Sequence, residues 1–84
     1  MDQNKIGQFI AARRKAVRLT QAELAEQLGI TDRAVSKWET GRTMPDTALM
    51  LELCIILKIN VNDLLCGEEI SMKDNNQRKK ETDT

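Results

Sequence analysis

The chain has 84 residues, with 13 basic and 13 acidic side chains and no histidine. This length fits one small domain. Apolar residues make up 40% of the sequence but aromatic residues only 2%, so we expect an all-α fold with an aliphatic core. Without histidine, the commonest general base and metal ligand is missing, and two cysteines are too few for a zinc site or a disulfide scaffold. We therefore expect no enzyme activity, no metal and no cofactor.

The balanced net charge hides an uneven distribution along the chain. Residues 1–45 contain eight Lys or Arg and five Asp or Glu, a charge of +3, whereas residues 46–70 contain one Lys and five acidic residues, a charge of −4. A basic half and an acidic half suit a module that presents one face to a polyanion. The longest apolar stretch, residues 48–57, is about half a membrane span and contains Glu52, so we expect no membrane segment and a cytoplasmic location.

The spacing of apolar residues predicts a first helix over residues 5–17. Its inner stripe consists of Ile6, Phe9, Ile10, Arg13 and Val17. Gly7 is the one weak position of this helix, because glycine has a poor helix propensity. The basic residues Arg13, Lys15 and Arg18 are expected to form a solvated run that can add long-range attraction for a polyanion.

Two short helices are predicted on either side of a three-residue turn, residues 29–31. They cover residues 20–28 and 32–40. Thr20 and Glu23 form a capping-box sequence, Gly29 stands where a left-handed residue ends a helix, and Thr31 is a good N-cap for the helix that follows. The wedge between the helices is filled by Leu24, Ala25, Leu28, Ile30, Val35 and Trp38. This pattern predicts a helix-turn-helix.

Two further helices are predicted over residues 46–57 and 61–65, the second capped by Asn60. The core stripe of the first consists of Met50, Leu53, Cys54 and Leu57, which makes a buried, reduced thiol the expected role of the cysteine. The expected organisation is one domain over residues 1–70 and a disordered polar tail or linker over residues 71–84.

The segment TQAELAEQLGITDRAVSKWETGRTMPD, residues 20–46, resembles the phage-repressor and Cro-like (xenobiotic-response-element, lambda-repressor-like) helix-turn-helix family. The similarity covers residues 5 to about 66 and so includes all five predicted helices. It implies a compact five-helix domain that binds operator DNA, usually as a symmetric dimer, and acts as a transcriptional regulator. The implied partner is double-stranded DNA, with the second helix of the motif in the major groove, and the expected effect is repression.

The third predicted helix has only Val35 and Trp38 as its apolar seam, which leaves its charged face to read base edges. Arg33 can donate two hydrogen bonds to a guanine, and Lys37, one turn later, can donate to a neighbouring guanine. Asp32 can accept from a cytosine or can simply complement the helix dipole. The resemblance implies base contacts at these three positions, and the alternative is that they are solvated surface charges.

Phosphate contacts are expected around this helix. Gln21 opens the second helix, where its side chain and backbone amide can hold a phosphate, and the resemblance assigns it that role. The resemblance implies further backbone contacts from Thr31, Ser36, Thr40, Arg42 and Thr43. Capping explains the threonines equally well. For Arg14 and Glu39, the resemblance implies a partly buried structural ion pair rather than a DNA contact.

Two residues depart from the family pattern. Lys58 stands where a glycine commonly closes the fourth helix, so we expect a strained or differently shaped turn, and Ile55 stands where a polar residue is common. The fourth helix is hydrophobic nearly all round, so part of it should meet a partner. We expect a homodimer, whose interface can be weak enough for the dimer to form only on DNA. The candidate contact residues are Leu49, Leu51, Ile55, Ile56, Leu64 and Leu65, with a surface of the first helix as the alternative.

A second interpretation stays open on the sequence alone. The same fold can serve as an antitoxin-like or protein-interaction module whose helix-turn-helix does not read DNA. The predominantly basic third helix favours DNA, whereas an acidic or apolar outer face would favour the interaction role. RNA is disfavoured because the chain has no aromatic platform on which bases could stack.

Overall fold

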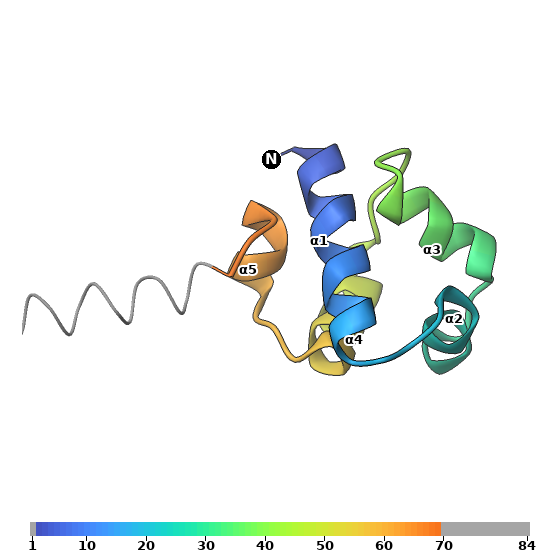
Figure 1. Cartoon of the computed structure of the whole chain (residues 1–84). Helices are drawn as coiled ribbons and strands as arrows, with labels where there is room; N and C mark the ends of the chain where they lie inside the picture. Colours follow the sequence, from blue (N-terminus) through green and yellow to red (C-terminus); the bar gives the residue numbers. More distant parts are fainter. Residues whose placement is uncertain (1, 70–84) are drawn as a thin grey trace, which may run out of the picture.

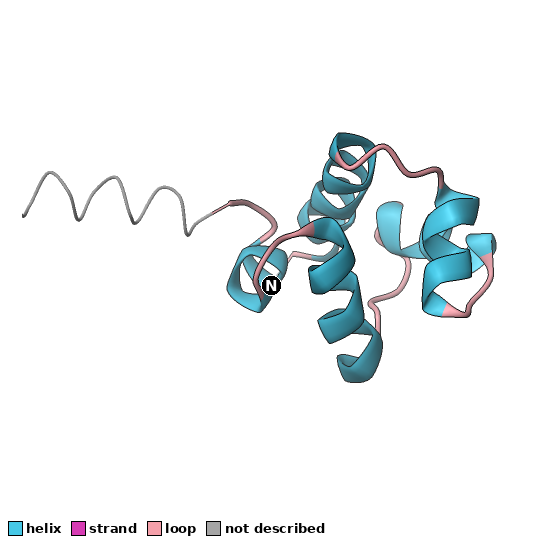
Figure 2. Cartoon of the chain, turned by 90° about the horizontal axis from the view of Figure 1, so that it is seen from below, coloured by secondary structure: helices cyan, strands magenta, loops and turns pink. Residues whose placement is uncertain are grey.

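The computed structural model describes residues 2–69, so the predicted tail over residues 71–84 lies outside the described part. Within residues 2–69 the chain forms five helices joined by short loops, without a strand (Figures 1 and 2). They are α1 (Gln3–Ala16), α2 (Gln21–Leu28), α3 (Asp32–Glu39), α4 (Thr47–Leu57) and α5 (Val61–Cys66). The all-α, five-helix prediction is confirmed. None of these helices is long and apolar enough to cross a membrane.

Each helix begins at a side chain that caps its N-terminus by accepting a hydrogen bond from a backbone N–H of the first turn. The caps are Asp2, Thr20, Thr31, Asp46 and Asn60. The three caps that the sequence predicts, Thr20, Thr31 and Asn60, are confirmed. The sequence does not predict Asp2, whose carboxylate accepts two backbone N–H bonds, and α1 therefore begins two residues before the expected residue 5. Asp46 is the cap of α4 rather than its first residue.

The core surrounds α1, which packs against α3 on one side and α5 on the other (Figure 1). Its fully buried side chains are Ile6, Ile10, Leu24, Val35, Leu53, Leu57 and Leu64. In α3 only Val35 and Trp38 are buried, as the sequence predicts. Cys54 is a buried free thiol, as expected, and burial raises the pKa of this thiol above its ordinary value. The neutral thiol therefore behaves as a small apolar core residue.

Gly7 is a point of close contact between α1 and α3. A Cβ atom added there would collide with the backbone carbonyl oxygen of Trp38 and would lie 2.9 Å from that of Glu39. The sequence predicts Gly7 only as a position of low helix propensity, and this prediction is incomplete. The absence of a side chain at Gly7 also lets α1 and α3 approach closely.

Arg13 does not belong to a solvated basic run, and this prediction is wrong. Its side chain is half-buried, and its guanidinium donates to the carbonyl oxygen of Leu57 at 2.9 and 3.3 Å and pairs with Glu69 at 3.3 Å. The guanidinium therefore satisfies a carbonyl at the C-terminal end of α4. Lys15 and Arg18 are exposed, as expected.

Only some of the six residues predicted to contact a partner from α4 and α5 are exposed. Leu51 and Ile55 are exposed, whereas Leu49, Ile56 and Leu65 are half-buried. Leu64 cannot belong to an outer surface, because it points inward from α5 and is completely buried in the core.

Lys58 ends α4 in the left-handed conformation, with φ 60° and ψ 47°, which agrees with the expected strain. Replacing it with glycine should raise the free energy of unfolding by about 0.5–1 kcal/mol, because glycine adopts this conformation without a steric cost. Thermal denaturation measures the change. Lys15→Gly, inside α1, is the matched control and should lower stability by roughly 0.5–1 kcal/mol. A loss of stability in Lys58→Gly would contradict the strain.

Candidate nucleic-acid interface

The turn between α2 and α3 is fixed by hydrogen bonds among its own residues. The capping box of α2 is complete, with bonds of 2.8 and 3.0 Å between Thr20 and Glu23. Gly29 ends α2 at φ 71°, which favours glycine even though an added Cβ would meet nothing within 4 Å. The Thr31 hydroxyl then accepts a backbone N–H of the first turn of α3 at 3.2 Å. These local interactions orient α3 with its apolar seam inward.

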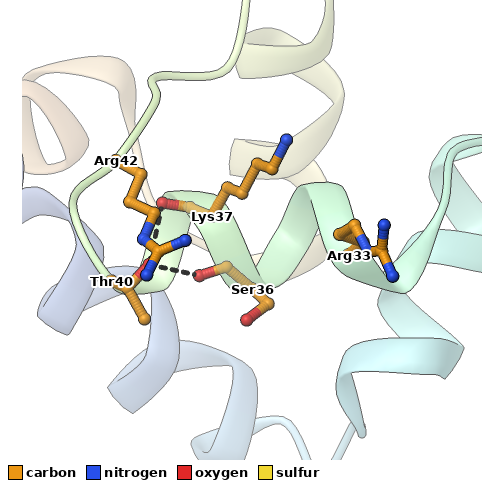
Figure 3. Close-up of a pocket in the computed structure, with 5 residues that line it drawn as sticks. All are labelled: Arg33, Ser36, Lys37, Thr40 and Arg42. Carbon is orange, nitrogen blue, oxygen red and sulfur yellow. Dashed lines mark hydrogen bonds between the residues drawn. The ribbon is translucent and has the colours of Figure 1, made fainter.

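The outer face of α3 and the loop after it form an open hollow. The hollow is lined by Arg33, Ser36, Lys37, Thr40 and Arg42, all of which the sequence predicts as contact residues (Figure 3). Arg33 and Lys37 are exposed and lie one turn apart on the helix, and Arg42 is exposed on the loop. Because three cations and no carboxylate line the hollow, it presents a positive electrostatic potential.

Hydrogen bonds to the last carbonyl groups of α3 hold the C-terminal edge of this hollow. The Thr40 hydroxyl donates to the Ser36 carbonyl oxygen at 2.9 Å, and the backbone N–H of Arg42 donates to the Lys37 carbonyl oxygen at 2.9 Å (dashed in Figure 3). The loop backbone is thereby fixed against the end of α3, which leaves the side chain of Arg42 beside the helix.

Four other predicted contact residues lie outside the hollow. Asp32 is exposed at the first position of α3, where its charge complements the helix dipole. Thr31 is the cap of the same helix, and Thr43 is exposed in the loop that follows Arg42. Gln21 is half-buried at the first position of α2.

Gln21 belongs to a polar network around Glu39. The guanidinium of Arg14 donates to the Glu39 carboxylate at 2.7 and 3.1 Å and to the Leu19 carbonyl oxygen at 2.8 Å. The hydrogen bond to Glu39 raises the pKa of Arg14 above its ordinary value. The side-chain amide of Gln21 donates to the same carboxylate at 2.9 Å. The ion pair that the resemblance implies is therefore present, and it extends to a residue expected to contact phosphate.

The sequence does not predict the link between Gln21 and Glu39. The two residues lie 18 positions apart on different helices, so no helical spacing relates them. Only the crossing of α2 and α3, set by the tight turn, brings the amide to the carboxylate.

A helix-turn-helix family profile matches residues 10–64, more than half of the chain. The cryptic phage CTXphi transcriptional repressor RstR from Vibrio cholerae is 33% identical over 63 residues, which cover 75% of this chain and 55% of that protein. Repressor protein C2 of Salmonella phage P22 is 34% identical over 68 residues, which cover 81% of this chain and 32% of that repressor. The chain thus spans about half or less of the length of these curated relatives.

Solved structures show the same similarity. The P22 c2 repressor, solved in complex with a synthetic operator, has a TM-score of 0.71 and 35% identity, with 75% of this chain and 96% of that chain covered. The restriction-modification controller protein C.AhdI from Aeromonas hydrophila has a TM-score of 0.69 and 30% identity over the same shares. The family profile, the relatives and the α2–turn–α3 geometry agree. The chain belongs to the phage-repressor and Cro-like helix-turn-helix family.

Proposed function

We propose that the chain is a sequence-specific DNA-binding transcriptional regulator, a repressor, that places α3 in the major groove of an operator. The observation that carries the proposal is the division of α3 into a buried seam and an exposed, cationic face around Arg33 and Lys37. The similar repressors and the operator-bound c2 structure support it. These relatives do not favour the antitoxin-like alternative. The proposal includes no enzymatic step.

Base readout is assigned to three side chains on the outer face of α3, Asp32, Arg33 and Lys37. Arg33 has the planar, forked guanidinium that matches the O6 and N7 acceptors of guanine. Lys37 lies one turn further along α3 and can donate to a neighbouring guanine. Asp32 can accept from the amino group of a cytosine. These three side chains are exposed and lie on one helix, so they can enter one groove together.

Phosphate contacts are assigned to the rim of the same surface. Arg42 contributes a charge, and the α2 N-terminus with Gln21 contributes backbone and side-chain N–H groups. Thr31, Ser36, Thr40 and Thr43 are assigned polar contacts to the DNA backbone. In this arrangement the second hydrogen of the Gln21 amide remains for a phosphate, while the first is held by Glu39.

Two copies of the chain are proposed to act on one operator. One helix in one groove makes too few contacts for tight specific binding, so a second copy is needed. Two-fold symmetry would place the two α3 helices about 34 Å apart and would require a nearly palindromic operator. Access to DNA requires the cytoplasmic location that the sequence predicts.

Removal of the two base readers tests the proposal. With a site selected from random DNA, Arg33→Ala and Lys37→Ala should each cost about 1–3 kcal/mol of binding free energy and should relax preference at one or two base pairs. Arg42→Ala should weaken all sequences alike and reduce the slope of affinity against salt. Fluorescence anisotropy over a salt series measures both quantities.

The matched control for this series is Lys15→Ala, which removes one exposed charge from α1. It should leave base preference unchanged and alter affinity only slightly. If Arg33→Ala and Lys37→Ala behave like this control, α3 does not read the operator.

A further inference from the structure

Two large apolar side chains remain exposed in the described part of the chain. Leu51 is 54% exposed and Ile55 is 77% exposed, and both belong to α4. They lie one turn apart, and the exposed Ala48 lies one turn before Leu51 on the same face. The buried residues Leu53 and Leu57 point the other way, into the core. We call the exposed residues Ala48, Leu51 and Ile55 the α4 strip.

The α4 strip is separate from the candidate DNA surface. It lies on a different helix and shares no residue with the hollow formed by α3 and its loop. A partner on the strip and DNA on α3 therefore use different side chains and do not compete for the same residues.

The charges beside the strip make it self-complementary. Glu52 and Lys58 are exposed, and neither belongs to an ion pair among residues 2–69. In a two-fold contact, residue i of one copy meets residue j of the other, and j meets i. Ile55 lies three positions from each charge, so a two-fold axis near Ile55 can pair each Glu52 with the partner's Lys58.

We propose that the α4 strip is the contact surface between two copies of this chain, with Ile55 near the two-fold axis. A second copy fits better than an unrelated protein because the residues beside the strip already include both members of the bordering ion pair, Glu52 and Lys58. Two large side chains supply only part of the ~800 Å² per partner that stable interfaces bury. The free dimer is therefore weak, and two copies bound to neighbouring half-sites associate more strongly because their effective concentration is high.

Sedimentation of the free chain over a concentration series tests this surface without DNA. The wild type should show a weak monomer–dimer equilibrium, and Ile55→Glu should raise its dissociation constant by about tenfold or more, because it places a carboxylate at the contact. Ala12→Glu, at an exposed position of α1, is the control and also tests the alternative surface. Thermal denaturation of each variant confirms that it folds.

A second measurement uses DNA and rests on the proposed function. On a palindromic site selected from random DNA, Ile55→Glu should lose cooperative binding but keep the wild-type affinity for an isolated half-site. A wild type that binds no DNA refutes the proposed function, while the sedimentation series still tests the strip. The α4 strip is not the contact surface if Ile55→Glu dimerises and binds DNA like the wild type, or if only Ala12→Glu weakens association. The proposal is also refuted if the wild type stays monomeric both free and on any DNA that it binds.

Charge reversal tests the pairing across the axis. Glu52→Lys and Lys58→Glu should each weaken association, and the double variant should restore it to within about twofold of the wild type. Failure of the double variant to recover would rule out the Glu52–Lys58 pair and the axis near Ile55.

Discussion

Replacing Glu39 with alanine is expected to lower the free energy of unfolding by about 3–5 kcal/mol. The substitution leaves the guanidinium of Arg14, whose side chain is only 11% exposed, without its counter-charge. It also removes the acceptor of the Gln21 amide. Small domains have total stabilities of about 5–15 kcal/mol, so the loss should be visible as a large fall in the urea midpoint followed by circular dichroism.

The control for this experiment is Glu26→Ala, on the exposed side of α2. Loss of that solvated carboxylate should change stability by less than about 0.5 kcal/mol. Replacing both members of the pair, Arg14→Met with Glu39→Leu, should recover most of the lost stability, because no unpaired charge is then buried. If Glu39→Ala and Glu26→Ala have equal effects, the ion pair does not stabilise the domain.

The position of this ion pair explains why it matters to the candidate DNA surface. Arg14 lies near the end of α1, Glu39 at the end of α3 and Gln21 at the start of α2. One carboxylate thus connects three helices at the place where α3 must be held for readout. A variant that weakens the connection should lose DNA affinity as well as stability.

The parts of the fold that the sequence predicts well are those set by short-range interactions. Capping residues act within three positions of the helix they begin, so Thr20, Thr31 and Asn60 can be identified without knowledge of the tertiary structure. The buried seam of α3 likewise follows from helical spacing. The same local pattern, together with the family resemblance, predicts every residue that lines the hollow.

The incorrect or incomplete predictions concern contacts between distant segments. Arg13 looks like one member of a solvated basic run, but the C-terminal end of α4 provides it with a carbonyl acceptor. Leu64 looks like an outer residue of a short helix, but α5 turns it into the core. Gln21 looks like a free polar side chain until the crossing of α2 and α3 brings Glu39 to it. Helical spacing places Arg13 on the inner stripe of the first helix, but neither composition nor periodicity identifies contacts between segments that lie far apart in the sequence.

Gly7→Ala should lower the free energy of unfolding by about 1–2 kcal/mol, although helix propensity alone predicts the opposite change. In a helix interior, alanine is about 1 kcal/mol more favourable than glycine. At this position, however, the added methyl group would meet the carbonyl oxygens of Trp38 and Glu39, which are backbone atoms and cannot rotate away. Relief requires α1 and α3 to separate, which loosens the packing of Trp38.

The sign of the change decides between the two effects. Ala12→Gly, at an exposed position of the same helix, should lower the free energy of unfolding by about 1 kcal/mol through helix propensity alone. This variant therefore measures the size of the propensity effect in α1. Thermal and urea denaturation of both variants give the comparison. Because α3 must shift to accept the methyl group, Gly7→Ala should also bind DNA more weakly than its remaining folded fraction explains. If Gly7→Ala raises stability instead, the methyl group fits between α1 and α3, and the close contact at Gly7 is contradicted.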